Sequence, residues 1–343
     1  MIDPMPTTDM TADVLLRVRD LSVEFPSKHL LKAVDGVSLD VRPGEILGLV
    51  GETGSGKTVF VTSILGLIRK PGRITHGSIT WRGRDLLDLK ERELRSIRGT
   101  EISMVFQNPL PSLNPSKRIG AQVRDLLIYH SICPKQQAEE HAVALLRRVQ
   151  LPDPERVMTL YPFECSGGMC QRILIAMALC GKPKLLIADE PTTSLDVTVQ
   201  AQIIRLILRL KREFGMAVLF VSHDLGVMAS ICDRVAVMYR GRIVETARSV
   251  DLFSNPSHPY TQALLRSSLL FSGKGSADQL DDPLPEDPNL DVPDGLGCRF
   301  LSRCPESIST CQTVDPNLIL LSGSESHSVA CIRRCAANTP INT

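Results

Sequence analysis

Residues 51–58, Gly-Glu-Thr-Gly-Ser-Gly-Lys-Thr, have the types and spacing needed to bind the phosphates of a nucleotide. They fit the pattern G-x-x-x-x-G-K-[ST], in which glycines let backbone N–H groups turn toward phosphate oxygens. Lys57 would then reach the β- and γ-phosphates, and the Thr58 hydroxyl would bind Mg²⁺. The alternative is a glycine-rich turn with an exposed lysine. We predict a phosphate loop made of Gly51, Glu52, Thr53, Gly54, Ser55, Gly56, Lys57 and Thr58.

The context of this loop favours the phosphate-binding interpretation. An apolar run at 46–50 precedes it and predicts a buried strand. Apolar residues at helical spacing follow it, and a helix N-terminus favours bound anions through its dipole. The loop therefore lies between a strand and a helix, as a phosphate loop requires.

A second set of reactive side chains ends the apolar run "LLIADEP" at 185–191. Successive side chains on a strand point in opposite directions, so Asp189 and Glu190 are expected to have different roles. Asp189 can hold Mg²⁺, usually through water, while Glu190 can act on an attacking water. An acidic turn after a core strand is the alternative. The sequence has no Asn-Lys-x-Asp motif for reading guanine, so ATP is favoured over GTP.

The stretch "CSGGMCQR" contains Cys165 and Cys170 on either side of a Ser-Gly-Gly. The two cysteines could be a metal or redox pair, or the glycines could be the functional feature. A pair spaced C-x4-C with no nearby partner ligands is a poor metal site, and a reducing cytosol disfavours a disulfide. We predict that the glycines matter and that the cysteines are incidental.

Strand-like and helix-like segments alternate along most of the chain, which predicts an α/β fold with a mostly parallel sheet. The segment 117–180 is mainly helical and would form a lobe on that sheet. Residues near 234–245 predict a hairpin that turns at Arg240-Gly241. Residues 272–297 are rich in Gly, Asp and Pro, which indicates a linker or exposed loop.

Composition limits the classes of protein. The 39 Lys and Arg balance the 38 Asp and Glu, so the charge gives no nucleic-acid footprint. No apolar run approaches the roughly 20 residues that span a bilayer, and the N-terminus resembles no secretory signal. We therefore expect a soluble cytosolic chain, in which structural disulfides among the ten cysteines are disfavoured.

The phosphate loop, "LLIADEP" and "CSGGMCQR" together resemble the motifs of ABC-type ATPases, whose signature is usually written LSGGQ. Cys165 stands where that family usually has leucine. The resemblance implies that the signature residues bind the γ-phosphate of an ATP held by a partner subunit. These residues are Ser166, Gly167, Gly168 and Met169.

The resemblance assigns roles to further residues. Gln107 in "VFQNP" would contact the metal and the attacking water, and with Thr58 and Asp189 it would hold Mg²⁺. Ser194 and Asp196 match the D-loop. His223 would contact the γ-phosphate, although a lone histidine is more often structural. Phe25 would stack on adenine, although an aromatic at a strand end is commonly core. Glu190, His223 and Gln107 are thus the expected catalytic residues.

Several stretches, among them "MVFQNPLPSLNP" and "PSHPYTQALL", resemble the ATP-binding subunits of oligopeptide/dipeptide and nickel ABC importers. This implies a P-loop ABC-type domain with a mostly parallel core sheet, an antiparallel β subdomain and a helical lobe. The expected divisions are a disordered N-terminus at 1–13, the ATPase domain at 14–265, a linker at 266–297 and a cysteine-rich C-terminal extension at 298–343.

The implied partners are a second, homologous but non-identical ATPase subunit and two permease subunits at the cytoplasmic face of the inner membrane. A solute-binding protein outside the cytoplasm would act indirectly, and no nucleic acid is expected. The cargo would be peptides, with nickel or another small solute as the alternative. A non-transport ABC ATPase and a non-catalytic scaffold are the competing classes. A scaffold would be expected to lack Lys57, Glu190 or His223, and all three are present.

The last fifty residues contain five cysteines. Four of them, Cys298, Cys304, Cys311 and Cys331, resemble a motif of these importer subunits that binds a [4Fe–4S] cluster in some members. Four thiolates can hold such a cluster or a zinc ion, but the absence of a C-x2-C pair fits common zinc sites poorly. Unligated thiols are the third possibility. Cys335 is a substitute ligand or a bystander.

Overall fold

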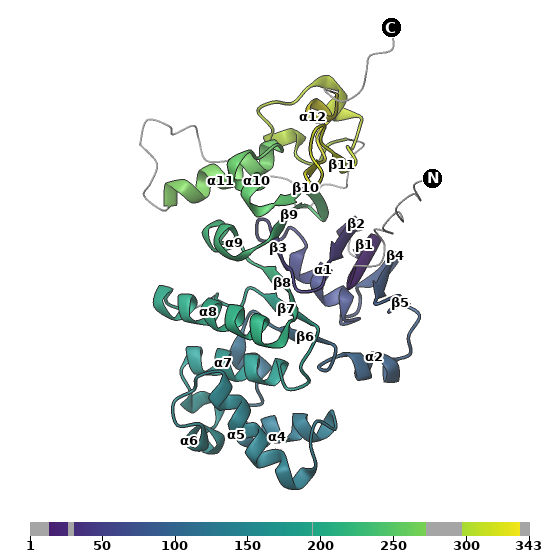
Figure 1. Cartoon of the computed structure of the whole chain (residues 1–343). Helices are drawn as coiled ribbons and strands as arrows, with labels where there is room; N and C mark the ends of the chain where they lie inside the picture. Colours follow the sequence, from purple (N-terminus) through teal and green to yellow (C-terminus); the bar gives the residue numbers. More distant parts are fainter. Residues whose placement is uncertain (1–13, 27–30, 194, 272–296, 337–343) are drawn as a thin grey trace, which may run out of the picture.

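The computed structural model of the chain describes residues 14–26, 31–193, 195–271 and 297–336. The predicted disordered segment 1–13, most of the predicted linker and Ser194 lie outside the described residues. Within them, two sheets form the centre, a helical lobe lies at one end, and the C-terminal segment 297–336 lies at the other (Figure 1).

The larger sheet has eight strands in the order β11-β12-β10-β9-β3-β8-β7-β6. Strands β9, β3, β8, β7 and β6 are parallel, and β10, β12 and β11 add antiparallel pairs at one edge. The sheet is therefore mixed. Its strands are β3 (Ile46–Val50), β6 (Ile102–Val105), β7 (Leu185–Asp189), β8 (Ala217–Val221), β9 (Arg234–Tyr239), β10 (Arg242–Arg248), β11 (Ile319–Leu320) and β12 (Ser328–Val329).

The smaller sheet is antiparallel, with the order β2-β1-β4-β5. It comprises β1 (Leu16–Phe25), β2 (Leu31–Val41), β4 (Arg73–Trp81) and β5 (Arg84–Asp85). Bulges interrupt the register of β1 with both neighbours, which bends this sheet over α1. The smaller sheet thus covers one face of the larger one.

The helices fall into two groups. Around the sheets lie α1 (Lys57–Ile64), α2 (Glu91–Ile97), α8 (Val197–Phe214), α9 (Leu225–Ile231), α10 (Ser249–Ser254), α11 (Pro259–Phe271) and α12 (Ile332–Ala336). The lobe comprises α3 (Pro109–Ser112), α4 (Ile119–Tyr129), α5 (Ala138–Arg148), α6 (Pro154–Thr159) and α7 (Gly167–Ala178).

The two faces of the parallel strands pack into two separate cores. In β3, Leu47 and Leu49 join the core beneath α1 and the smaller sheet, whereas Ile46 and Val50 join the core shared with α8 and the lobe. The alternation of side chains along a strand separates them. The same alternation in β7 turns Asp189 to the α1 side, which is the side of the phosphate loop.

Two sequence predictions about this architecture need correction or completion. The predicted linker start at 266 lies inside α11, which continues to Phe271. The division at 266 therefore cuts through this helix, whereas the Gly-, Asp- and Pro-rich composition begins only at 272, after the helix has ended. The segment 297–336 also contributes β11 and β12 to the larger sheet, a pairing the sequence did not predict.

Candidate functional site

The phosphate loop connects β3 to α1 and is closely packed. Gly56, at the N-terminus of α1, has φ of 102°, a conformation that a side chain would strain. A Cβ at Gly51 would lie 2.1 Å from the Met238 carbonyl oxygen, and one at Gly56 would lie 2.2 Å from that of Ala33. These glycines are required because neighbouring backbone fills the space of a side chain.

Lys57 closes the loop from inside. Its Nζ donates to the carbonyl oxygens of Gly51 and Glu52, at 2.8 and 2.9 Å. Burial lowers the pKa of this ammonium group, and the charges of Glu190, Asp189 and Glu52 oppose that effect. The lysine is therefore a buried cation held at the centre of the loop, where an incoming phosphate would meet it.

Asp189 lies next to Thr58 at the end of β7. Its side chain is 2% exposed, and burial raises the pKa of its carboxyl group, against the effect of a hydrogen bond from Thr58. Its buried Oδ1 has no hydrogen-bond partner among the described residues. A buried carboxylate oxygen with no partner, beside a threonine hydroxyl, fits a site for Mg²⁺.

Glu190 is the centre of a cluster of polar side chains. Its Oε2 accepts hydrogen bonds from Gln107 Nε2 and from the Thr193 hydroxyl, both at 2.9 Å. His223 Nδ1 lies 3.4 Å from the same oxygen. The structure thus brings together the three predicted catalytic residues, which come from the ends of β6, β7 and β8.

The backbone at Glu190 is unusual. Its φ is 46°, in the left-handed region that non-glycine residues rarely adopt. The Glu190 N–H donates to the Val221 carbonyl at 2.9 Å, which fixes the bend. Such strain concentrates at functional sites, and this residue is the one whose carboxylate contacts Gln107 and His223.

Ser166 and the two glycines after it begin α7. The Ser166 hydroxyl caps the helix by accepting from Met169 N at 3.3 Å. Ser166 and Gly167 are exposed, and Gly168 lies against α8, where an added Cβ would be 2.9 Å from Val199. Cys170 is buried in the core, and burial raises the pKa of its thiol to about 11, far from a reactive thiolate.

Two of the remaining nucleotide-site candidates, Asp196 and Phe25, make contacts within the fold. Asp196 caps α8 by accepting from Val199 N at 2.9 Å. Phe25 is half-buried at the end of β1, and a Cβ at Gly72 would lie 2.4 Å from its ring. Ser194 lies outside the described residues.

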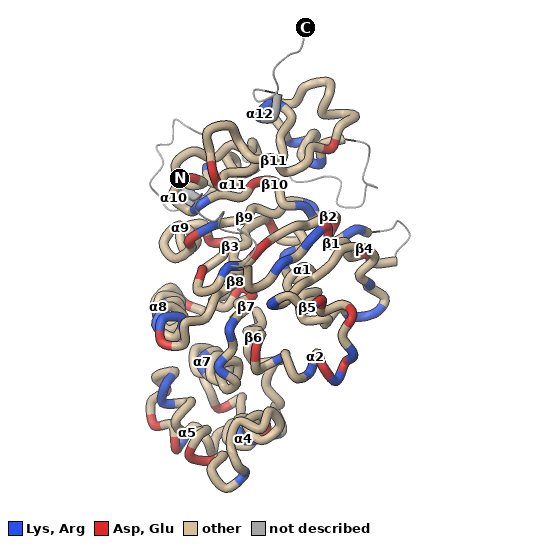
Figure 2. The backbone as a smooth tube through the Cα atoms, turned by 45° about the vertical axis from the view of Figure 1, so that its right-hand side comes forward, with Lys and Arg blue, Asp and Glu red and all other residues tan. Residues whose placement is uncertain are grey.

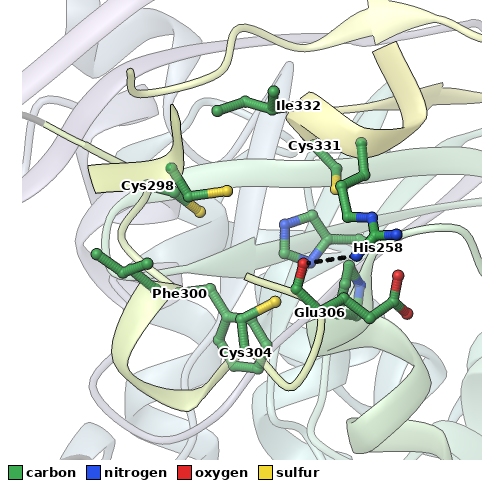
Figure 3. A pocket seen from close by; sticks show the side chains of 11 residues that line it. His258, Cys298, Phe300, Cys304, Glu306, Cys331 and Ile332 are labelled. Atoms are coloured by element: carbon green, nitrogen blue, oxygen red, sulfur yellow. Dashed lines mark hydrogen bonds between the residues drawn. The ribbon is translucent and has the colours of Figure 1, made fainter. Parts of the chain in front are cut away.

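Four of the C-terminal cysteines line one small cavity, together with His258, Phe300 and Glu306 (Figure 3). They are Cys298, Cys304, Cys311 and Cys331. The cavity volume is about 20 Å³, roughly the room of one water. Burial raises the pKa of the Cys298 thiol to about 11 and that of Cys304 above its ordinary value.

The cysteines share the cavity without forming a ligand cage. Among the described residues, no three His, Cys, Asp or Glu side chains are arranged to hold a metal ion. This arrangement of the four thiols therefore gives the predicted [4Fe–4S] cluster no support. The sequence motif predicted their convergence on one place but not this closed arrangement.

The distribution of charged residues and the character of the helices bear on what the described part of the chain can bind or cross. Basic and acidic residues are interspersed along the backbone rather than gathered by sign (Figure 2). No helix in the described ranges combines the length and the apolar character that crossing a bilayer requires.

Two family models match the chain. One, described as ABC transporter, covers residues 34–193. The other, described as Oligopeptide/dipeptide transporter, C-terminal region, covers residues 244–311. The first contains the phosphate loop, Gln107, the signature residues, Asp189 and Glu190, and the second reaches into the cysteine-lined cavity.

Similar proteins extend over nearly the whole chain. A probable peptide ABC transporter ATP-binding protein of Sinorhizobium fredii is 46% identical over 94% of this chain and 96% of its own length. The oligopeptide transport ATP-binding protein OppD of Salmonella typhimurium is also 46% identical, over 89% and 90%. The dipeptide transport ATP-binding protein DppD of Haemophilus influenzae is 43% identical over 96% of both chains.

Solved structures agree with the fold. The dimeric post-hydrolysis state of an ATP-binding cassette bound to ADP and Pi superposes with a TM-score of 0.61 and 26% identity, covering 68% of this chain and 98% of that one. The fold and the site therefore define an ATPase of the ABC class. Within that class, the chain belongs to the family of ATP-binding subunits of oligopeptide/dipeptide ABC transporters.

Sequence reasoning missed three residues that contact this site. Thr193 holds Glu190, Tyr260 accepts from the Glu52 N–H at 2.9 Å, and Arg303 pairs with the Glu52 carboxylate. Thr193 could have been suspected from its place three residues after Glu190. Tyr260 and Arg303 carry no local signal, because they are more than 200 residues from Glu52.

Proposed function

We propose that this chain binds and hydrolyses ATP to drive import of dipeptides or oligopeptides through a membrane transporter. The observation that carries the proposal is the cluster at Glu190, where Gln107, Thr193 and His223 surround one carboxylate oxygen beside the phosphate loop. The relatives from Sinorhizobium, Salmonella and Haemophilus are described as peptide, oligopeptide and dipeptide transport proteins, which supports peptides as the cargo.

In the proposed mechanism, the N–H groups of residues 51–58 and the Lys57 ammonium bind the β- and γ-phosphates. Asp189, Thr58 and Gln107 would hold Mg²⁺, which supplies charge neutralisation to the phosphates when bound. Phe25 would stack on the adenine. These residues orient the nucleotide so that its γ-phosphate faces the end of β7.

Glu190 then acts on the attacking water. Its contacts from Gln107, Thr193 and His223 all reach Oε2, so within the described residues Oε1 is left to accept a hydrogen bond from that water. A carboxylate fixed in this way orients the water and takes up its proton as it attacks the γ-phosphate. His223 would contact the γ-phosphate from the exposed side.

The signature residues would act on a second ATP. Ser166, Gly167, Gly168 and Met169 begin α7 on an exposed face, and a helix N-terminus attracts an anionic phosphate. We propose that two ATPase subunits face each other head to tail, with a homologous, non-identical chain as the partner. Ser194 and Asp196 would lie along that junction. The dimeric cassette among the similar structures supports the pairing of two ATPase subunits.

The rest of the proposed assembly follows from the family. The lobe, linked to the ATP site through Gln107, would press on two permease subunits at the cytoplasmic face of the inner membrane. An extracytoplasmic solute-binding protein would deliver the cargo. Nickel or another small solute is the second candidate cargo, since a motor of this kind does not itself select the substrate.

We also propose that residues 297–336 form a cysteine-rich extension that can hold a [4Fe–4S] cluster. Cys298, Cys304, Cys311 and Cys331 would be the ligands, and the convergence of all four on one cavity supports this. Iron and sulfide analysis after anaerobic purification tests it. About four of each per chain is the expected result, zinc alone would replace the cluster with a zinc site, and no metal would leave free thiols.

Uptake measurements test the transport function. Labelled dipeptide and radioactive nickel are followed in cells with the wild-type chain and in cells with Glu190→Gln. Loss of dipeptide uptake alone is the expected result. Loss of nickel uptake alone would keep the motor role and change the cargo, and capture of two permeases with the tagged chain would separate a transporter subunit from a non-transport ATPase.

A further inference from the structure

Arg303 connects the C-terminal segment directly to the phosphate loop. It lies in the short 3-10 turn η4 (Leu301–Arg303), and its side chain is 5% exposed. Its Nη1 donates to Glu52 Oε2 at 2.9 Å, and its Nη2 donates to Glu52 Oε1 at 3.0 Å. This is the paired geometry in which a guanidinium binds a carboxylate most strongly.

Two aromatic rings lie against the arginine of this pair. The Arg303 guanidinium lies 5.8 Å from the centre of the Tyr239 ring and 5.9 Å from that of Phe300. Although burial alone would lower the pKa of Arg303, its hydrogen bonds to Glu52 and Tyr239 raise it. Contacts from several sides thus hold the guanidinium in place and restrict the rotamers of the long Arg303 side chain.

Glu52 is held at three points. Its carboxylate binds Arg303, its N–H donates to the Tyr260 hydroxyl at 2.9 Å, and its carbonyl accepts from Lys57 Nζ at 2.9 Å. The residue therefore stands between the C-terminal segment and the lysine expected to meet the phosphates. A substitution at Arg303 would therefore affect the position of Lys57 through Glu52, which contacts both residues.

The ion pair between Arg303 and Glu52 also changes the charge that the loop presents to a nucleotide. Glu52 places a carboxylate in a loop that must receive a highly anionic triphosphate. An unpaired negative charge there would oppose nucleotide binding, whereas Arg303 neutralises it at hydrogen-bond distance. The pair thus makes the loop both better ordered and less repulsive toward phosphate.

We infer that Arg303 is a positioning residue for the ATP site, which fixes and neutralises Glu52 so that nucleotide affinity depends on the docked C-terminal segment. This inference rests on the proposed role of residues 51–58 in binding ATP. It makes the segment 297–336 a part of the nucleotide site rather than an attachment beside it.

Titration of the full-length chain with MgADP tests the inference, because no hydrolysis intervenes. Arg303→Ala should raise the Kd about tenfold, and Arg303→Lys, which keeps the charge but not the paired geometry, about threefold. Adding Glu52→Gln to Arg303→Ala should return the Kd to within about threefold of wild type, since it removes the unpaired charge. A purely structural role for Arg303 would not give this rescue.

Arg299→Ala is the matched control. Arg299 is also a buried arginine of the C-terminal segment, 9% exposed, but it pairs with Asp35 of β2. Its loss should lower the melting temperature as Arg303→Ala does while leaving the Kd within about twofold of wild type. In the assembled transporter, Arg303→Ala should raise the KM for ATP and leave kcat nearly unchanged.

The outcomes are distinguishable. If Lys57→Ala does not weaken MgADP binding, the assignment of the phosphate loop fails, and this inference fails with it. If Lys57→Ala weakens binding but Arg303→Ala stays within twofold of wild type, or if Glu52→Gln gives no rescue, only the inference is overturned. Should Arg303→Ala not fold, Arg303→Gln, which also leaves the Glu52 charge unpaired but keeps a longer side chain, is compared with and without Glu52→Gln and decides in the same way.

Discussion

Two helix N-termini of this chain are rich in glycine, but they are completed in different ways. At the phosphate loop, Lys57 is buried, Gly51 and Gly56 lie against the backbone of β9 and β2, and Glu52 pairs with Arg303 of the C-terminal segment. At the start of α7, Ser166 and Gly167 are exposed, and the hydroxyl of Ser166 is occupied with capping its own helix. In the proposed function, the first site is completed within one chain, whereas the second offers an exposed helix N-terminus to a partner subunit.

This difference predicts which substitutions alter the isolated chain and which act only after two ATPase subunits have assembled. Changes at the enclosed loop should alter nucleotide binding by the isolated chain. Changes at the open helix end should leave that binding intact and act only after a second subunit brings its own ATP. Four substitutions test this division, in order of decreasing effect.

Glu190→Gln should lower turnover of the assembled transporter by about 100-fold or more, because the amide cannot take up the proton of the attacking water. ATP affinity should stay close to wild type, and the dimer should accumulate in a closed, ATP-bound form. Steady-state phosphate release and size-exclusion chromatography with ATP measure the two effects. Turnover at the wild-type rate would remove Glu190 from its proposed role.

Lys57→Ala should raise the Kd of the isolated chain for MgADP by about 10- to 100-fold, since it removes a charge-assisted contact to phosphate. Calorimetric titration measures this change. Lys184→Ala removes an exposed lysine just before β7, at the end of the parallel strands opposite the loop, and is the control that should bind like wild type. Unchanged affinity in Lys57→Ala would contradict the enclosed site.

Ser166→Arg should lower turnover of the assembled transporter about tenfold, because a long side chain blocks the approach of a phosphate to the start of α7. The isolated chain should bind MgADP within about twofold of wild type, which is the opposite of the Lys57→Ala pattern. Comparing both variants in both assays measures the division directly. A weakened isolated chain would mean that the open helix end also supports the chain's own site.

Cys170→Ala should have the smallest effect. Cys170 is fully buried behind the open helix end, so losing its sulfur should cost about 1 kcal/mol of unfolding free energy. Turnover should not change, because the glycines rather than the cysteines carry the proposed function. Urea unfolding and phosphate release measure the two, and a loss of turnover at unchanged stability would restore a functional role for this thiol.

The parts of the site that sequence could predict are those set by local chemistry. Residues 51–58 form a phosphate loop because glycines, a strand and a helix follow one another directly, and Asp189 and Glu190 separate because side chains on a strand alternate. The resemblance to ABC-type ATPases placed Gln107 and His223, which the structure brings to the same carboxylate oxygen.

The parts that sequence could not predict depend on packing between distant segments. The pairing of Glu52 with Arg303 joins residues 251 positions apart, and no periodicity or composition encodes such a contact. The addition of β12 to β10 likewise depends on where residues 297–336 dock. The closed cavity between the four cysteines depends on side-chain packing that a spacing motif does not specify.

The pairing of β12 with β10 has a consequence for how the chain is made. Until β12 has left the ribosome, the hydrogen-bonding edge of β10 at Glu245 and Thr246 is open. An open edge is a template for pairing with another chain, and it persists for the roughly 80 residues that follow β10, several seconds at ordinary synthesis rates. A chain shortened after α11 would keep that edge permanently, so nascent and truncated forms are expected to need a chaperone to stay monomeric.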